Sequence, residues 1–390
     1  MRVVNCLYLT VVLVGCSTHV SEPNGQLPLE EPVWLRTGGV DQGLGLAEAI
    51  DGTLVIVGRT DGDLGQGDAF VLKTSLDGEV EWQKTLGSNG VDVLLDVGVH
   101  ENGSIFAGGV STGNYEGEQN ELFSDGALSA LSASGEVLWS QLVGLGAINQ
   151  LVVVRDGLVV TGSGIQSERQ DADAFVAKYN LSGERLWQLW LRSDGNDSAT
   201  GITAIDGQLW VVGFTDGALF SNETASNLRG WIALIDNDGA LVRGNELEGE
   251  EEQSLTRVCG TPNGDIAVAG YVIDENGGID SIVKRYDASH SELNTWRSGW
   301  QGSDAVYGLA CEGNGSIALS GRLDVAEDAD GFWVRLRSDL SVQDENLASY
   351  SGRDEWVDVI EVEGGLCFSG YRPFDDNPDI DDLDAVAECN

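Results

Sequence analysis

The chain has 390 residues, of which 64 are acidic and 21 are basic, and its formal net charge is −43. Because nucleic-acid affinity rests on Lys and Arg side chains that neutralise phosphates, this charge excludes nucleic acid as an expected partner. The 53 glycines, 6 prolines and 42% hydrophobic residues are typical of a folded chain with many short strands and tight turns.

The first 15 residues combine Arg2 with an apolar stretch that ends in Leu13-Val14-Gly15, just before Cys16. This stretch is too short to span a bilayer as a helix. Residues 1–15 resemble a bacterial lipoprotein signal peptide with its lipobox; the alternatives are an ordinary signal peptide and a short membrane anchor.

The lipoprotein resemblance implies cleavage before Cys16 and acylation of Cys16, with Ser17 favouring the outer membrane of a Gram-negative bacterium. The lipid is then the only membrane contact, and the protein faces either the periplasm or the cell surface. Residues 16–32 contain three prolines and are expected to form a flexible tether.

A short apolar run ending in glycine recurs seven times in the remaining chain. A period near 50 residues indicates stacked structural units. Each unit predicts four strands, which in the first unit are residues 46–50, 54–58, 69–73 and 80–86. Dipeptides such as Asp51-Gly52 and Asn102-Gly103 predict two-residue hairpin loops between the first two strands. The recurring glycines are Gly58, Gly108, Gly162, Gly213, Gly270, Gly321 and Gly370.

The second and third strands of each unit are continuously apolar, as in residues 54–57 and 174–177, which indicates that both sheet faces are covered. We therefore predict an all-β protein in which residues 33–390 form one seven-bladed β-propeller of four-stranded antiparallel blades.

The seventh unit has predicted strands at residues 357–362, 366–370 and 384–388, and the chain ends before a fourth. Residues 33–37 match residues 81–85 of a fourth strand, with Trp34 at the position of Trp82. We expect this N-terminal strand to complete the last blade and close the ring. The recurring Trp82, Trp139 and Trp187 are expected to pack between blades.

Four cysteines remain after the signal peptide and Cys16, and an oxidising compartment permits three pairings among them. An antiparallel register of the last two strands predicts a disulfide between Cys367 and Cys389. Cys259 and Cys311 lie one blade apart, and we expect their Cα atoms to exceed the limit of about 7 Å for a bridge. Two buried free thiols are therefore favoured over a second disulfide.

Asp68-Ala69-Phe70-Val71, its counterpart at residues 173–176 and the opening Gly195-Asn196-Asp197 resemble SBBP-type β-propeller repeats, and the resemblance covers nearly the whole chain after the signal peptide. It implies a propeller in an extracytoplasmic setting, without shared catalytic residues. A more distant similarity is to the repeats of the lipoprotein that assists outer-membrane β-barrel assembly.

Long loops are expected on one face of the ring, where binding is favoured. The residues that follow the strand glycines are expected at the channel mouth. Salt bridges to nearby acids are their favoured role, and binding of carbohydrate or peptide is the alternative. These residues are Arg59, Phe214, Tyr271, Arg322 and Tyr371.

Two loops are rich in carboxylates with the spacing that Ca²⁺ prefers. A solvated acidic loop is the favoured interpretation, bound Ca²⁺ is the alternative, and no other cofactor is implied. The candidate ligands are Asp61, Asp63 and Asp68 in the first unit and Asp379, Asp381 and Asp384 in the seventh.

The three histidines, His19, His100 and His290, support neither a Ser-His-Asp arrangement nor a His-based metal site. We predict a monomeric, non-enzymatic envelope lipoprotein that binds a protein or a glycan. The alternatives are a scaffold for envelope assembly and a polysaccharide-active enzyme that uses a pair of carboxylates.

Overall fold

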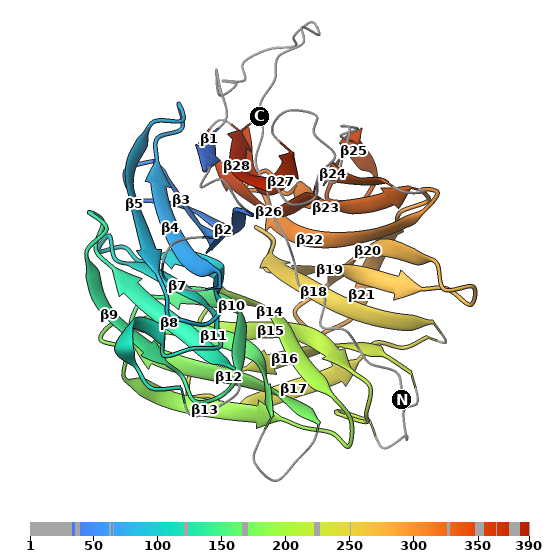
Figure 1. Ribbon diagram of the computed structural model, residues 1–390. Coiled ribbons are helices and arrows are strands. Elements are labelled where there is room, and N and C mark those ends of the chain that lie inside the picture. The colour runs from blue at the N-terminus through green and yellow to red at the C-terminus, as the bar shows by residue number, and fades with distance from the viewer. Residues whose placement is uncertain are drawn as a thin grey trace, which may run out of the picture.

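Seven four-stranded antiparallel sheets are arranged in a ring in the computed structural model of the protein (Figure 1). The structure describes residues 33–35, 40–61, 64, 66–120, 124–165, 171–221, 227–249, 251–325, 328–347, 355–363, 365–373 and 383–389. The predicted seven-bladed all-β propeller is confirmed. The predicted signal peptide and tether, residues 1–32, lie outside the described residues.

Each blade uses four strands that are consecutive in the chain, except the last. Blade 1 contains β2 (Gln42–Glu48), β3 (Leu54–Thr60), β4 (Asp68–Thr74) and β5 (Val80–Leu86). Blade 2 contains β6 (Asp92–Val99), β7 (Ile105–Ser111), β8 (Asp125–Leu131) and β9 (Val137–Leu142). Blade 3 contains β10 (Ala147–Val154), β11 (Gly157–Ile165), β12 (Ala172–Asn180) and β13 (Arg185–Leu191).

Blade 4 contains β14 (Asp197–Ile205), β15 (Gln208–Thr215), β16 (Arg229–Ile235) and β17 (Leu241–Glu246). Blade 5 contains β18 (Glu252–Gly260), β19 (Ile266–Ile273), β20 (Ile279–Tyr286) and β21 (Glu292–Arg297). Blade 6 contains β22 (Ser303–Cys311), β23 (Ile317–Val325), β24 (Asp328–Leu336) and β25 (Val342–Leu347). Blade 7 contains β26 (Glu355–Val362), β27 (Gly365–Pro373), β28 (Leu383–Cys389) and β1 (Val33–Leu35).

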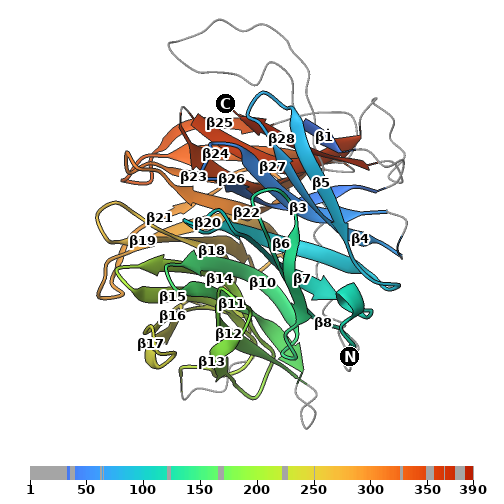
Figure 2. The same ribbon diagram turned by 90° about the vertical axis from the view of Figure 1, so that its left-hand side faces the viewer.

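A single helical turn, η1 (Tyr115–Gly117), is found among the described residues, in the connection between β7 and β8 (Figure 2). Tyr115 is buried there, and its hydroxyl is 2.9 Å from the Oγ of Ser129. Within the described part of the chain, we find no helix that is long and apolar enough to cross a membrane.

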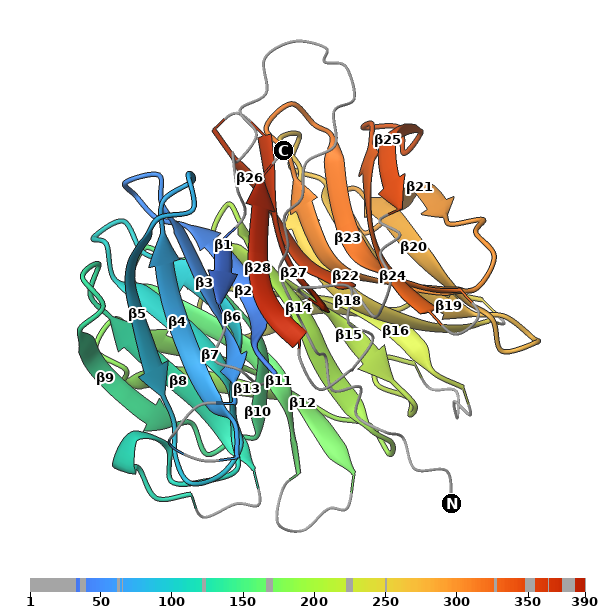
Figure 3. The same ribbon diagram turned by 45° about the horizontal axis from the view of Figure 1, so that its top comes forward.

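The ring is closed by strands from the two ends of the chain. In Figure 3, β1 lies beside β28, and the register pairs Val33 with Ala387 and Leu35 with Ala385. The predicted closure is therefore confirmed. The predicted match of Trp34 to Trp82 is wrong. Trp34 pairs with Val386 in the same way that Thr85 pairs with Phe70 in blade 1, so Trp34 is equivalent to Thr85. A short strand carries too little pattern to set its register from sequence alone.

The middle strands supply the core. In blade 1, every residue of β4 and all but one of β3 are buried, whereas β5 is largely exposed. Buried side chains from neighbouring blades form shared apolar clusters; one contains Val57 and Val71 of blade 1 together with Ala107 and Leu131 of blade 2. The blades therefore stabilise one another face to face, as the continuously apolar runs predicted.

The innermost strands start earlier than predicted, because their first halves contain polar residues and glycines; β2 begins at Gln42 rather than at residue 46. Each of these strands carries a β-bulge where it pairs with the next strand, as between Gly43 and Gly45 in β2. A Cβ on Gly58, opposite this bulge, would lie 1.5 Å from the carbonyl oxygen of Gln42, so this position requires glycine.

In blade 2, the glycine opposite the bulge is Gly109 rather than the predicted Gly108. Gly109 pairs with Leu94, and its Cβ would lie 2.0 Å from the carbonyl oxygen of Val93. The two glycines are consecutive in the sequence, and the bulge alone distinguishes their roles.

The predicted two-residue turns are wrong for most blades. In blade 2 the amide of Gly103 donates to the carbonyl oxygen of His100, and that of His100 donates to the carbonyl oxygen of Ser104, which makes a three-residue loop with Gly103 at φ 86°. In blade 4, Asp206 and Gly207 both have positive φ and form the predicted two-residue turn.

Polar side chains at the bulges join neighbouring blades around the hub. Asn149 Nδ2 donates to the carbonyl oxygen of Ala199 at 2.9 Å. Thr200 Oγ1 donates to that of Leu255 at 2.6 Å, and Thr256 makes the equivalent bond to blade 6. Buried carbonyl oxygens that a bulge takes out of the sheet ladder thus receive donors from the preceding blade.

Tryptophans join the outer parts of blades 1 to 4, as predicted. The indole Nε1 atoms of Trp82, Trp139 and Trp187 each donate at 3.0 Å to a carbonyl oxygen in the last turn of the following blade. Each indole also stacks on a turn glycine; a Cβ on Gly239 would lie 2.6 Å from the ring of Trp187.

Two disulfides are present among the described residues. Cys367 pairs with Cys389 across β27 and β28, as predicted, with a Cα–Cα distance of 4.0 Å. Cys259 and Cys311 are also bonded, with a Cα–Cα distance of 5.6 Å, so the predicted pair of free thiols is wrong. Innermost strands of neighbouring blades converge at the hub, which brings equivalent positions of β18 and β22 within bonding distance.

Candidate functional site

The predicted channel-mouth residues occupy one register position in five different blades, so they are distributed around the ring. Arg59 forms an ion pair with Asp61 at 3.3 Å, and Arg322 forms ion pairs with Asp324 and with buried Glu355, the latter at 2.7 Å. The favoured salt-bridge role therefore describes both arginines.

The aromatic members of this set are turned toward protein. Tyr371 is 2% exposed and packs with Leu44 and Tyr307. Burial raises the pKa of Tyr271, and Phe214 is half-buried.

Few of the predicted calcium ligands can be placed. Asp63, Asp379, Asp381 and the side chain of Asp384 lie outside the described residues. Asp61 contacts Arg59, and Asp68 Oδ2 accepts a hydrogen bond from the amide of Leu64 at 2.7 Å. Within the described ranges, no group of three or more His, Cys, Asp and Glu residues is arranged to hold a metal ion.

The hub contains two carboxyl groups that the sequence analysis did not single out. Asp96 accepts a 2.7 Å hydrogen bond from the amide of Leu151 in the next blade, and Asp358 accepts one of 3.0 Å from Leu46. Burial, followed by the charge of Asp358, raises the pKa of Asp96 to about 7. Burial also raises the pKa of Asp358 to about 6, against the opposing effect of Arg257.

A cavity of about 440 Å³ lies between blades 1 and 2. We call it the seam pocket. Its walls combine small aliphatic side chains with carboxylate, amide and ammonium groups, a mixture suited to a ligand that is partly apolar and partly polar. The lining residues are Ala49, Ile50, Asp51 and Lys73 of blade 1 and Val99, Glu101, Asn102, Gly103, Ile105 and Ala133 of blade 2.

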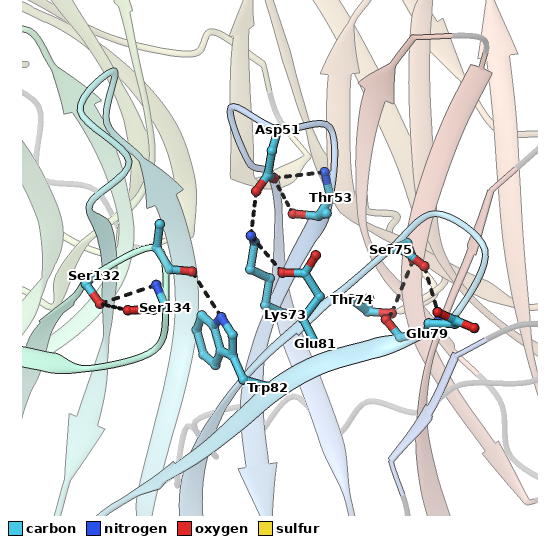
Figure 4. A network of polar contacts seen from close by, with 11 residues as sticks. Asp51, Thr53, Lys73, Thr74, Ser75, Glu79, Glu81, Trp82, Ser132 and Ser134 are labelled. Atoms are coloured by element: carbon cyan, nitrogen blue, oxygen red, sulfur yellow. Dashed lines mark hydrogen bonds and ion pairs between the residues drawn. The ribbon is translucent and has the colours of Figure 1, made fainter.

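Lys73 is the cation of the seam pocket. Figure 4 shows its ammonium between the carboxylates of Asp51, at 2.6 Å, and Glu81, at 2.9 Å. The Lys73 side chain is 4% exposed, whereas that of Asp51 is 55% exposed. The chain places these groups together because Lys73 lies near the end of β4, beside the β2–β3 turn and the start of β5.

Asp51 and Lys73 both stay charged at neutral pH. The hydrogen bond from Lys73 lowers the pKa of Asp51 to about 2, with a further contribution from Thr53. Burial alone would lower the pKa of Lys73, but its hydrogen bonds to Asp51 and Glu81 raise it above its ordinary value. The seam pocket therefore offers a fixed ammonium donor beside an aliphatic wall.

No family model matches the chain, and no curated protein matches it. Among solved structures, the chain is similar to Sqt1 from Chaetomium thermophilum, with 13% identity, a TM-score of 0.52 and coverage of 87% of this chain and 83% of that one. It is also similar to a protein of unknown function from Dyadobacter fermentans, with 13% identity, a TM-score of 0.48 and coverage of 75% and 93%. At such identities, similarity supports the fold alone.

Proposed function

We propose that this protein is a cell-envelope lipoprotein that uses a rigid propeller to bind a glycan or a protein, without catalysing a reaction. The binding part of the proposal is supported by the seam pocket, which joins a fixed ammonium to an aliphatic wall on a ring closed by β1. A closed ring changes shape little, so its pockets are preformed and ligand binding costs less ordering entropy.

The envelope part rests on covalent chemistry. Disulfides persist in oxidising compartments and are rare in the bacterial cytoplasm, and the pairs Cys259–Cys311 and Cys367–Cys389 are both bonded. The lipobox-like Leu13-Val14-Gly15-Cys16 and the similarity to SBBP repeats add a lipid anchor and an extracytoplasmic setting to the proposal.

Metabolic labelling with a palmitate analogue tests the anchor. The full chain is expected to incorporate the label, and Cys16→Ser is expected to abolish it. Labelling that persists in Cys16→Ser contradicts lipidation at this residue. Protease treatment of intact cells then distinguishes the two faces of the membrane, because a surface-displayed propeller is trimmed and a periplasmic one is protected.

A glycan array probed with the full-length protein tests the binding role, and polysaccharide products are monitored in parallel. We expect saturable binding without turnover. Turnover that is lost on substitution of one carboxylate would establish the enzyme alternative instead. Binding to neither glycans nor envelope proteins contradicts the proposed function.

A further inference from the structure

In blades 1, 3 and 5, a lysine or arginine side chain occupies one register position beside the seam to the next blade, and the seam pocket occurs at one of these seams. Lys178 and Arg285 also bond to the next blade, whereas both partners of Lys73 lie in blade 1. In each case the cation reaches a carboxylate of its own blade and faces the last turn of the next blade. These cations are Lys73 between blades 1 and 2, Lys178 between blades 3 and 4, and Arg285 between blades 5 and 6.

The turn residue differs between the seams. Lys178 Nζ is 2.9 Å from Asp156 and 3.3 Å from the side-chain amide oxygen of Asn237. At the seam of blades 5 and 6, the longer Arg285 reaches the carbonyl oxygen of Ser338 directly. The residue facing Lys73 is Ala133, whose side chain has no oxygen.

The equivalence of Ala133 and Asn237 follows from their shared contacts. The carbonyl oxygen of Ala133 accepts the indole N–H of Trp82, just as that of Asn237 accepts the indole N–H of Trp187. Each residue is the second residue of a turn closed by a glycine amide. The hollow beside Lys73 therefore occupies the place that an amide side chain fills beside Lys178.

An ammonium has three donors, and the hydrogen bonds of Lys73 to Asp51 and Glu81 use two of them. The neighbouring wall is aliphatic, with Val99, Ile105 and Ala133. A group that fits beside both features carries an amide oxygen for the ammonium and a small apolar substituent for the wall.

We propose that the seam pocket binds the acetamido group of an N-acetylhexosamine unit, with its carbonyl oxygen accepting from Lys73 and its methyl group packed on the aliphatic wall. This inference rests on the proposed binding function and names its ligand class. The rim residues Asp51, Glu101 and Asn102 supply acceptors and donors for sugar hydroxyls. A volume of about 440 Å³ lies within the range of small-molecule sites.

The test uses the full-length protein, titrated with N-acetylglucosamine, with glucose and with glutamine by ligand-observed NMR. We expect saturable binding of N-acetylglucosamine and at least tenfold weaker binding of glucose, which lacks the amide. Equal binding of the two sugars overturns the acetamido assignment, and tighter binding of glutamine assigns the pocket to a peptide amide instead.

Ala133→Asn is the decisive variant, because it recreates the side-chain contact seen at Lys178 and places an amide where the acetamido group is proposed to bind. We expect its melting temperature to be unchanged or higher and its affinity for N-acetylglucosamine to fall at least tenfold. The matched control is Ala288→Asn, at the equivalent turn position of blade 5, which should bind like the wild type. Wild-type affinity in Ala133→Asn overturns the proposal.

The outcomes separate this inference from the proposed function. If N-acetylglucosamine does not bind but a larger glycan or an envelope protein does, the acetamido assignment fails and the binding function stands. If a larger glycan binds and Ala133→Asn leaves that binding unchanged, the ligand uses another surface.

Discussion

Replacement of Cys259 and Cys311 by alanine removes a covalent link between two blades and is expected to lower the free energy of unfolding substantially. The bridge joins residues separated by 52 positions, and the chain-entropy relation gives about 4 kcal/mol for a loop of that length. The corresponding value for Cys367–Cys389, whose separation is 22, is about 3 kcal/mol. Alanine is chosen because it leaves no unsatisfied polar group at the half-buried sites.

The assay is urea unfolding followed by tryptophan fluorescence, without reductant. We expect both double-alanine variants to unfold at lower urea than the wild type, with the larger shift for the Cys259 and Cys311 pair. A fourth sample replaces Cys259, Cys311, Cys367 and Cys389 together by alanine. Reductant should lower the wild-type midpoint to that of this fourfold variant and leave the fourfold variant unchanged. A wild-type midpoint that is insensitive to reductant refutes the reasoning.

Deletion of residues 33–37, which include β1, should expose the edge of β28 and cost about 3 kcal/mol for up to three lost ladder hydrogen bonds; an unchanged melting temperature argues against closure by this strand. Gly239→Ala places a methyl group against Trp187 at φ 86°, whereas Gly207→Ala, at φ 76° with no atom within 4 Å, adds only the conformational cost of about 1–2 kcal/mol. Equal losses in the two variants, measured by denaturant titration, contradict a stabilising contact between Trp187 and the turn. The pKa of Asp96 is raised from its ordinary value of 3.8 to about 7 in the folded state. Between these two pH values, the folded state therefore keeps a proton that the unfolded state has lost. The contribution of Asp96 to stability is thus largest at low pH and declines as the pH rises toward 7. The unfolding free energy of the wild type, relative to Asp96→Asn, should therefore fall between pH 4 and pH 8, and a difference independent of pH contradicts the raised pKa of Asp96.

Local sequence patterns predicted the seven blades because each blade repeats the same local requirements. Continuous apolar runs specify strands buried on both faces. A glycine opposite the bulge, such as Gly58 in blade 1, is needed in each repeat. The pairing of Cys367 with Cys389 was predictable for the same reason, since adjacent antiparallel strands bring set positions opposite each other.

Other features depend on contacts that no single repeat contains. The register of β1 is decided by β28 from the other end of the chain, and the bond between Cys259 and Cys311 is decided by the convergence of strands at the hub. The seam pocket needs Lys73 of one blade and Ala133 of the next. An alignment of the repeats would reveal the difference between Ala133 and Asn237, but not that both face a lysine.

The amino-acid sequence by itself determined the number of blades, the strand type and the closure by the N-terminal segment, because hydrophobic periodicity and turn glycines act over a few residues. The tertiary structure decided the bridge between blades 5 and 6, the two carboxyl groups at the hub and the seam pocket. Each of these arises where side chains about 50 residues apart meet across a seam, and their distances depend on how the rigid blades pack rather than on any local pattern.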